Sequence, residues 1–284
     1  MKRLNNSDEH IKAVLPQIIS ERLDKKAESI TFIGGGSFGR VYKVVLSDGG
    51  IIAVKGYLLP EMHREEAYQL ELLAKNTSVQ MPQVIFTYED EETGILAMSF
   101  VEGRNVLSPA FLLKSKKQKQ IFASDVVSGM LEWHSVKNNK FGSLTNPTYD
   151  SWYEFYKNEK QIPWLKGLEG LAEKGKFSRK KLRLLQKATE IFDKLPREET
   201  EAVLIHADLN IMNIMADPKT LSLIAFIDPY GSIWADREYE LFQFRSMWGD
   251  AYGLYETYKK NAEPLNLPIS ESLTTVLCTR RQCG

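Results

Sequence analysis

The sequence predicts an α+β protein of two lobes, and this prediction rests on a change in hydrophobic pattern near residue 103. Before this point, runs of β-branched and aromatic residues are separated by turn signals such as SDGG and DEETG. After Gly103, apolar residues recur at helical spacing. We therefore expect a β-rich amino-terminal lobe over residues 1–102 and a mainly helical lobe over residues 103–284.

The apolar runs of the first lobe are expected to form one five-stranded, mostly antiparallel sheet. Between the third and fourth runs, Ala67, Leu70, Leu73 and Ala74 recur at helical spacing, which predicts one amphipathic helix over residues 61–75 inserted in the sheet. The runs cover residues 30–33, 41–46, 51–57, 84–88 and 95–101.

The second lobe is expected to begin with a helix at Ser108 and Pro109, whose apolar residues continue in helical rhythm as far as Trp133. Two further helices are predicted over residues 150–157 and 178–195. Short apolar runs interrupt the helices at residues 203–205, 214–216 and 223–227, with a DPKT turn before the last. These runs predict a β-hairpin within the helical lobe.

Composition excludes several classes of function. Lys plus Arg equals Asp plus Glu at 37 each, and the basic segments 114–119 and 179–187 lack interleaved aromatic residues, so we expect no nucleic-acid partner. The chain has no apolar signal core and no stretch long enough to span a bilayer, and Cys278 and Cys283 make no disulfide framework. We expect a cytoplasmic monomer or weak dimer without a membrane partner.

A glycine-rich segment lies between the first two predicted strands and reads GxGxxGxV. Small residues at a hairpin tip let backbone amides approach anionic oxygens, as a lid over nucleotide phosphates requires. A flexible turn is the alternative for such a motif alone, and a dinucleotide-binding fingerprint is disfavoured because a strand, not a helix, follows it. The predicted phosphate-binding residues are Gly34, Gly35, Gly36, Ser37, Phe38, Gly39 and Val41.

Lys55 ends the apolar run of residues 51–55, where an unpaired charge would be costly. The following helix offers Glu65, Glu66 and Glu71, of which Glu66 leads the pattern ExxxLxxL on the buried face. We expect Lys55 to pair with Glu66 and to bind nucleotide phosphates, with a solvated edge lysine as the alternative.

The motif HxDxxxxN at residues 206–213 directly follows a short apolar strand. Phosphoryl transfer needs an acid beside the attacking hydroxyl and an oxygen ligand nearby for the magnesium that bridges the phosphates of ATP. Asp208 suits the first role and Asn213 the second, and Asp228 after the last apolar run supplies a further metal ligand. His206 is expected to brace the backbone rather than to move protons, and His134 is expected to be a packed core residue.

The acceptor is expected to be a small molecule with a hydroxyl group. Ala207 stands where protein kinases have an arginine that reads a phosphorylated activation loop, and Asp228, Pro229 and Tyr230 replace their DFG. A predicted helix carrying Arg237 follows almost at once, which leaves little chain for a peptide platform.

Together these motifs resemble the fructosamine kinase (ketosamine 3-kinase) family within the aminoglycoside phosphotransferase superfamily, which has the two-lobed protein-kinase-like fold. The resemblance extends from about residue 30 to residue 258. It rests on GGGS at residues 34–37, residues 131–134 with Phe141 and Gly142, Trp152 with Phe155 and Tyr156, HxDxxxxN, and residues 227–229 followed by WADREYEL at residues 234–241.

The resemblance implies transfer of the ATP γ-phosphate to a sugar hydroxyl of a ketosamine. It implies adenine binding near Ser99 and Val101, and it makes Trp234, Asp236 and Tyr230 substrate-side residues, with packed or helix-capping roles as the alternative for these.

The chain departs from the family's usual sequence at several positions. Relatives usually carry HGDLW, where this chain has Ala207 and Asn210, and usually have an aspartate at the position of Glu240. The residues 272–284 read as a short, mixed tail instead of further helices, which predicts an altered carboxyl end.

Two other functions stay open. One is a related kinase acting on aminoglycosides, choline or another amino alcohol, although the basic tail does not suit polycationic drugs. The other is a catalytically inactive nucleotide-binding scaffold, against which the retention of Lys55, Asp208, Asn213 and Asp228 argues.

Overall fold

A computed structural model describes residues 3–194, 201–245 and 248–265 of the chain. The chain divides into two compact units, and the first comprises residues 1–103 together with residues 224–229. The second unit comprises residues 104–223 and 230–284. The tail at residues 272–284, including Cys278 and Cys283, lies outside the described residues, as does the predicted helix end at residue 195.

The first unit contains the predicted antiparallel sheet, in the strand order β1-β2-β3-β5-β4. The inserted helix α2 is also present as predicted. The elements are α1 (Asp8–Leu23), β1 (Ala27–Gly35), β2 (Gly39–Leu46), β3 (Ile51–Tyr57), α2 (Met62–Ala74), β4 (Val84–Glu89) and β5 (Gly94–Ser99).

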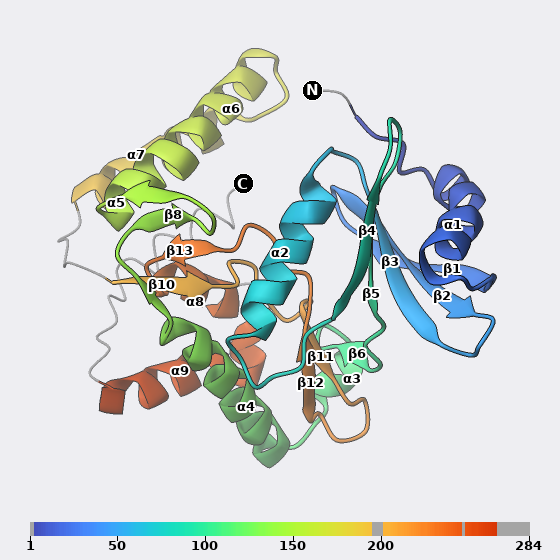
Figure 1. Ribbon diagram of the computed structural model, residues 1–284. Coiled ribbons are helices and arrows are strands. Elements are labelled where there is room, and N and C mark those ends of the chain that lie inside the picture. Colours follow the sequence, from blue (N-terminus) through green and yellow to red (C-terminus); the bar gives the residue numbers. More distant parts are fainter. Residues whose placement is uncertain (1–2, 195–200, 246–247, 266–284) are drawn as a thin grey trace. The chain divides into compact units, whose positions relative to one another are not determined.

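Helices α1 and α2 cover opposite faces of this sheet (Figure 1). Side chains of β3 alternate between the faces: Ile52 and Val54 join the apolar core beneath α1, while Lys55 and Tyr57 contact Glu66 of α2. Helix α1 was not among the predicted elements, because Pro16 lies in its interior, where proline normally argues against a helix.

The return of residues 224–229 to the first unit brings Asp228 to Lys55. Ala225 forms a parallel bridge with Gln80, and the backbone N–H of Phe226 donates to the carbonyl of Gln80 over 3.0 Å. Asp228, two residues later, is thereby held within reach of β3.

The second unit is mainly helical and contains a small sheet of strand order β7-β10-β13-β8-β9. Its helices are α3 (Pro109–Leu112), α4 (Lys116–His134), α5 (Trp152–Phe155), a π-helical turn (Tyr156–Gln161), α6 (Ile162–Glu173), α7 (Arg179–Lys194), α8 (Glu238–Arg245), α9 (Leu254–Ala262) and 3-10 turns at Gly249–Tyr252 and Glu263–Leu265. Its strands are β6 (Arg104–Asn105), β7 (Lys137–Asn138), β8 (Phe141–Ser143), β9 (Pro147–Tyr149), β10 (Ala202–Ile205), β11 (Ile214–Ala216), β13 (Ile233–Ala235) and the start of β12 (Leu223–Phe226).

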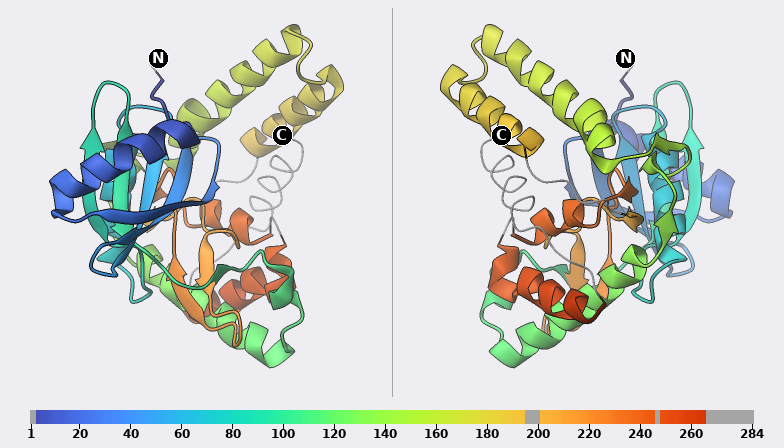
Figure 2. Two further views of the ribbon diagram at one scale, coloured as in Figure 1. Left: turned by 90° about the vertical axis from the view of Figure 1, so that its right-hand side faces the viewer. Right: turned by 90° about the vertical axis from the view of Figure 1, so that its left-hand side faces the viewer.

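Two helix predictions were wrong in extent. The helix expected from Ser108 to Trp133 is two helices, because a new helix starts at Ser115. There the side chain of Ser115 accepts from the backbone N–H of Gln118, and the side chain of Gln118 accepts from the backbone N–H of Ser115. The helix expected to end at residue 157 continues through a π turn into α6. Pro163 is accommodated in the first turn of α6, where its missing N–H breaks no helical bond. Helices α6 and α7 lie side by side (Figure 2).

Among the described residues, none of the helices combines the length and the apolar character that crossing a membrane requires.

Leu15→Ala should lower the free energy of unfolding by about 3 kcal/mol, because Leu15 is fully buried between α1 and the sheet. Leu113→Ala is the matched control, since Leu113 is 90% exposed and its truncation should cost less than about 0.5 kcal/mol. Urea denaturation followed by circular dichroism measures both. Equal effects of the two substitutions would show that α1 does not pack on the sheet.

Candidate active site

Lys55 lies at the centre of a buried charge cluster in the first unit. Its Nζ atom is 2.6 Å from Oε2 of Glu66 and 2.5 Å from Oδ1 of Asp228. Tyr57, two residues further along β3, donates its hydroxyl to the same Glu66 oxygen over 2.7 Å. The structure thus contains the ion pair expected between Lys55 and Glu66 and adds a tyrosine that the sequence analysis missed.

Burial and charge act in opposite directions on this cluster. Burial alone would lower the pKa of Lys55, but the carboxylates of Glu66 and Asp228 outweigh it, so this pKa is raised. Burial raises the pKa of Glu66 against the opposing effect of Lys55. Burial and the neighbouring Glu66 raise the pKa of Tyr57 well above its ordinary value. Lys55 therefore stays cationic while it is held among oxygen acceptors.

The glycine-rich segment forms the turn between β1 and β2, with residues 36–38 at its tip. The N–H of Gly36 donates to the carbonyl of Gly39 over 3.0 Å. A Cβ atom on Gly35 would lie 2.6 Å from that carbonyl oxygen, and one on Gly39 would lie 3.0 Å from Cε of Lys55. None of the glycines at positions 34, 35, 36 and 39 has a positive φ. What Gly35 and Gly39 permit is close approach of the chain to itself and to Lys55.

The remaining expected phosphate-loop and adenine residues occupy different surroundings. Phe38 is 39% exposed, and Val41 pairs with Lys55 across β2 and β3. Ser99 ends β5, where its N–H donates to the carbonyl of Gln83 over 2.8 Å. That N–H is thus used within the first unit, and adenine binding near Ser99 and Val101 stays a prediction.

Asp208 lies in a loop of the second unit between β10 and β11 that closes on itself. The side-chain amide nitrogen of Asn213 donates to the main-chain oxygen of Asp208 over 2.8 Å and to its Oδ2 over 3.0 Å. The amide of Asn210 donates to Oδ1 of Asp208 over 3.0 Å. Both contacts of Asn213 use its nitrogen, which leaves its amide oxygen for a cation.

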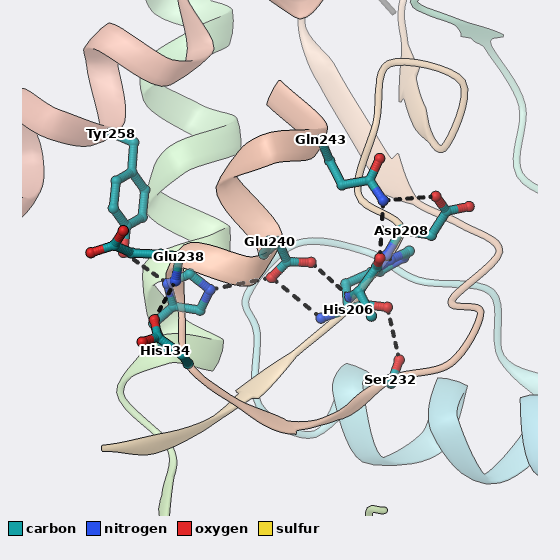
Figure 3. A network of polar contacts seen from close by, with 10 residues as sticks. His134, His206, Asp208, Ser232, Glu238, Glu240, Gln243 and Tyr258 are labelled. Atoms are coloured by element: carbon teal, nitrogen blue, oxygen red, sulfur yellow. Dashed lines mark hydrogen bonds and ion pairs between the residues drawn. The ribbon is translucent and has the colours of Figure 1, made fainter. Parts of the chain in front are cut away.

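Glu240, on α8, accepts hydrogen bonds from the backbone of this loop (Figure 3). Its fully buried carboxylate accepts from the backbone N–H groups of His206 and Ala207 over 3.3 and 2.9 Å. Nε2 of His134 lies 3.2 Å from it, and Nδ1 of the same ring lies 2.9 Å from the hydroxyl of Tyr258. The expectation of a packed His134 is confirmed, and the packing is polar.

Gln243 follows Glu240 by three residues on α8 and reaches the same loop. Its Nε2 donates to the main-chain oxygen of Ala207 over 3.1 Å and to Oδ1 of Asp208 over 3.2 Å (Figure 3). The sequence analysis did not single out Gln243. Its i+3 spacing from Glu240, which places both side chains on one helix face, was the available signal.

His206 is fully buried and its ring nitrogen Nδ1 accepts from the N–H of Asp208 over 3.4 Å. Its carbonyl accepts from the hydroxyl of Ser232 over 3.0 Å, and its ring lies 5.6 Å from that of Trp133. These contacts suit the backbone-bracing role expected for this histidine.

The three expected substrate-side residues differ in exposure. Trp234 is buried and its indole N–H donates to the carbonyl of Leu144, while the buried carboxylate of Asp236 accepts from the N–H of Glu238 at the start of α8. Both side chains thus have the packing and capping roles that were the alternative. Tyr230 is 49% exposed and stays a candidate for acceptor contact.

The oxygen atoms available to a metal ion suit Mg²⁺. The described residues hold no group of three or more His, Cys, Asp and Glu side chains that could bind a metal. Asp228 is half exposed, and only its Oδ1 contacts Lys55. Asp228 in the first unit offers a carboxylate oxygen and Asn213 in the second unit an amide oxygen, and each by itself is a hard ligand of the kind that Mg²⁺ accepts.

Comparison with known proteins agrees with this description. The family model described as fructosamine kinase matches residues 11–268. The uncharacterized protein YcbJ of Escherichia coli (strain K12) is 23% identical over 242 residues, which are 83% of this chain and 78% of YcbJ.

Two solved structures show the shared fold. A putative fructosamine-3-kinase from Thermobifida fusca has a TM-score of 0.67 at 20% identity, over 94% of this chain and 88% of that one. A ternary complex of aminoglycoside phosphotransferase APH(4)-Ia with AMP-PNP and hygromycin B has a TM-score of 0.67 at 12% identity, over 95% and 89% of the two chains. The fold is therefore the expected protein-kinase-like one.

Tyr57→Phe should flatten the loss of stability at alkaline pH. The pKa of Tyr57 is raised in the folded chain, so its hydroxyl contributes stability that is fully present below about pH 10 and is lost as the pH rises further. Above that pH, the native chain should lose about 1.4 kcal/mol per pH unit more than the variant. Urea midpoints between pH 8 and pH 11 measure the difference, and parallel curves would refute the buried hydroxyl contact.

Ala207→Gly should raise the free energy of unfolding by about 0.5 kcal/mol, because Ala207 has a φ of 67°, which is strained for any residue with a Cβ atom. Ala172→Gly, in the buried face of α6, is the control and should lower it by about 1 kcal/mol. Denaturant midpoints give the sign of each change. Destabilisation by both substitutions would mean that Ala207 is not strained.

Proposed function

The chain belongs to the fructosamine kinase family, and on that premise we propose that it transfers the γ-phosphate of ATP to a hydroxyl group of a ketosamine. Family membership makes the chain a phosphotransferase that acts on a small molecule. The geometry of the loop around Asp208 is the observation that supports activity over an inactive scaffold. Asp208, Asn213 and Lys55 all lie in ordered contacts with polar partners.

In the proposed reaction, Asp208 accepts the proton of the acceptor hydroxyl while that oxygen bonds to the γ-phosphorus. The bond between this phosphorus and the β–γ bridging oxygen breaks, and ADP leaves. Lys55, oriented by Glu66, binds the α- and β-phosphates, and the glycine loop supplies backbone N–H groups. Asn213 and Asp228 would hold Mg²⁺, which neutralises phosphate charge when it is bound.

This proposal assigns nucleotide binding to residues 1–102 and the acceptor to residues 103–284. The nucleotide is supported by the AMP-PNP complex of the structural relative described above. The acceptor class rests on the family alone. We further propose a cytoplasmic location and a monomer or weak dimer, as the composition suggests.

Asp208→Asn should reduce acceptor-dependent ADP release at least about 100-fold, because the amide cannot take the hydroxyl proton. The assay measures magnesium-dependent ADP release from ATP over ketosamines, free sugars, aminoglycosides and choline. Asp125→Asn, at an exposed position on α4, is the matched control and should leave the rate unchanged.

Stimulation by a ketosamine that Asp208→Asn abolishes would establish the proposed reaction. Stimulation by an aminoglycoside or choline alone would keep the kinase and change its acceptor class. ADP release that no acceptor stimulates would overturn the proposed activity.

A further inference from the structure

Three side-chain amides converge on the carboxylate of Asp208. Oδ1 accepts from Asn210 over 3.0 Å and from Gln243 over 3.2 Å, whereas Oδ2 accepts from Asn213 over 3.0 Å. Two donors come from residues in the loop itself, and the third comes from α8, since Gln243 lies 35 residues after Asp208 in the chain.

The side chain of Asn210 makes its hydrogen bonds within the loop. Its amide nitrogen also donates to the main-chain oxygen of Asp208 over 3.2 Å, and its amide oxygen accepts from the N–H of Met212 over 2.9 Å. The residue is only 3% exposed. Both the nitrogen and the oxygen of the Asn210 amide are therefore hydrogen-bonded within the loop.

Gln243 is held by its own surroundings. It is 4% exposed, and the carboxylate of Glu240, one turn earlier on α8, fixes the same loop through the N–H groups of His206 and Ala207. The position of α8 relative to the loop is thus set by Glu240. The Gln243 side chain that contacts Asp208 is therefore buried and held in place, not flexible and solvated.

We propose that Asn210 and Gln243 are positioning residues that hold the carboxylate of Asp208 in the orientation in which it receives the proton of the acceptor hydroxyl. This inference rests on the proposed kinase activity. A carboxylate with one oxygen held by two donors has a fixed orientation, and a catalytic group displaced by about 1 Å can lose about 100-fold in rate. In the reaction, the acceptor O–H bond breaks as the new O–P bond forms, the proton goes to the carboxylate of Asp208, and ADP departs with the electrons of the broken P–O bond.

The kinetic test uses Gln243→Met, which keeps the side chain's bulk and removes its donor, and the double variant with Asn210→Ala. We expect kcat to fall about 10- to 100-fold in the double variant while KM for ATP changes by less than about twofold, because only the orientation of Asp208 is altered. Gln161→Met is the matched control, since Gln161 is equally buried and its amide contacts Asp193 in the same unit. The control should retain the native kcat.

The second measurement does not depend on turnover. Crystal structures of the native chain and the double variant should show one conformer of Asp208 in the first and several, or a displaced one, in the second. An unchanged kcat in the double variant, or an undisplaced single conformer, would overturn the positioning role. If the native chain turns over no acceptor, the proposed function fails, and the two crystal structures alone decide whether the amides hold Asp208.

Discussion

A buried carboxylate is costly unless it is paired or hydrogen-bonded. Each unit of this chain contains a buried glutamate whose hydrogen bonds position the residues around it. In the first unit Glu66 is 4% exposed and binds Lys55 and Tyr57. In the second unit Glu240 is fully buried and binds two backbone N–H groups and His134. Removing the partners of either glutamate would leave a buried carboxylate without hydrogen bonds. The cost of that loss keeps the partner residues in place beside each glutamate.

The consequences extend to the residues proposed to act on substrate. Lys55 is fixed because Glu66 meets it from α2, and Gly39 leaves room for its side chain. The loop before Asp208 is fixed because the N–H groups of His206 and Ala207 donate hydrogen bonds to Glu240. In this loop Ala207 has a backbone conformation that residues carrying a Cβ atom rarely adopt. The hydrogen bonds to Glu240 offset this strain, and they also position Asp208.

The same contacts bear on the choice of acceptor. Trp234 is packed and donates to the carbonyl of Leu144, and Asp236 accepts from the first N–H of α8. Asn210 is hydrogen-bonded within its own loop. These contacts stabilise the fold. Met212 and Tyr230, which are 40% and 49% exposed, have surface to offer a ligand.

By itself, the sequence determined the strands and the inserted helix of the first unit, and it predicted site roles for Lys55, Glu66, Asp208, Asn213 and Asp228. It could do so because alternation, turn residues and motif spacing are local properties of the chain. It did not reveal α1, whose interior proline hides it, or the short strands β7, β8, β9 and β13, which are too brief to carry a period.

Only the tertiary structure decided which distant side chains complete each cluster. Tyr57 meets Glu66 because both face the same side of the sheet, and Glu240 and Gln243 meet the loop at residues 206–208 although more than thirty residues separate them. The burial of Trp234 and Asp236 is likewise seen only in the tertiary structure, since no local pattern distinguishes a packed aromatic from one that binds a ligand. These are properties of three-dimensional packing, which joins segments whose sequences carry no sign of each other.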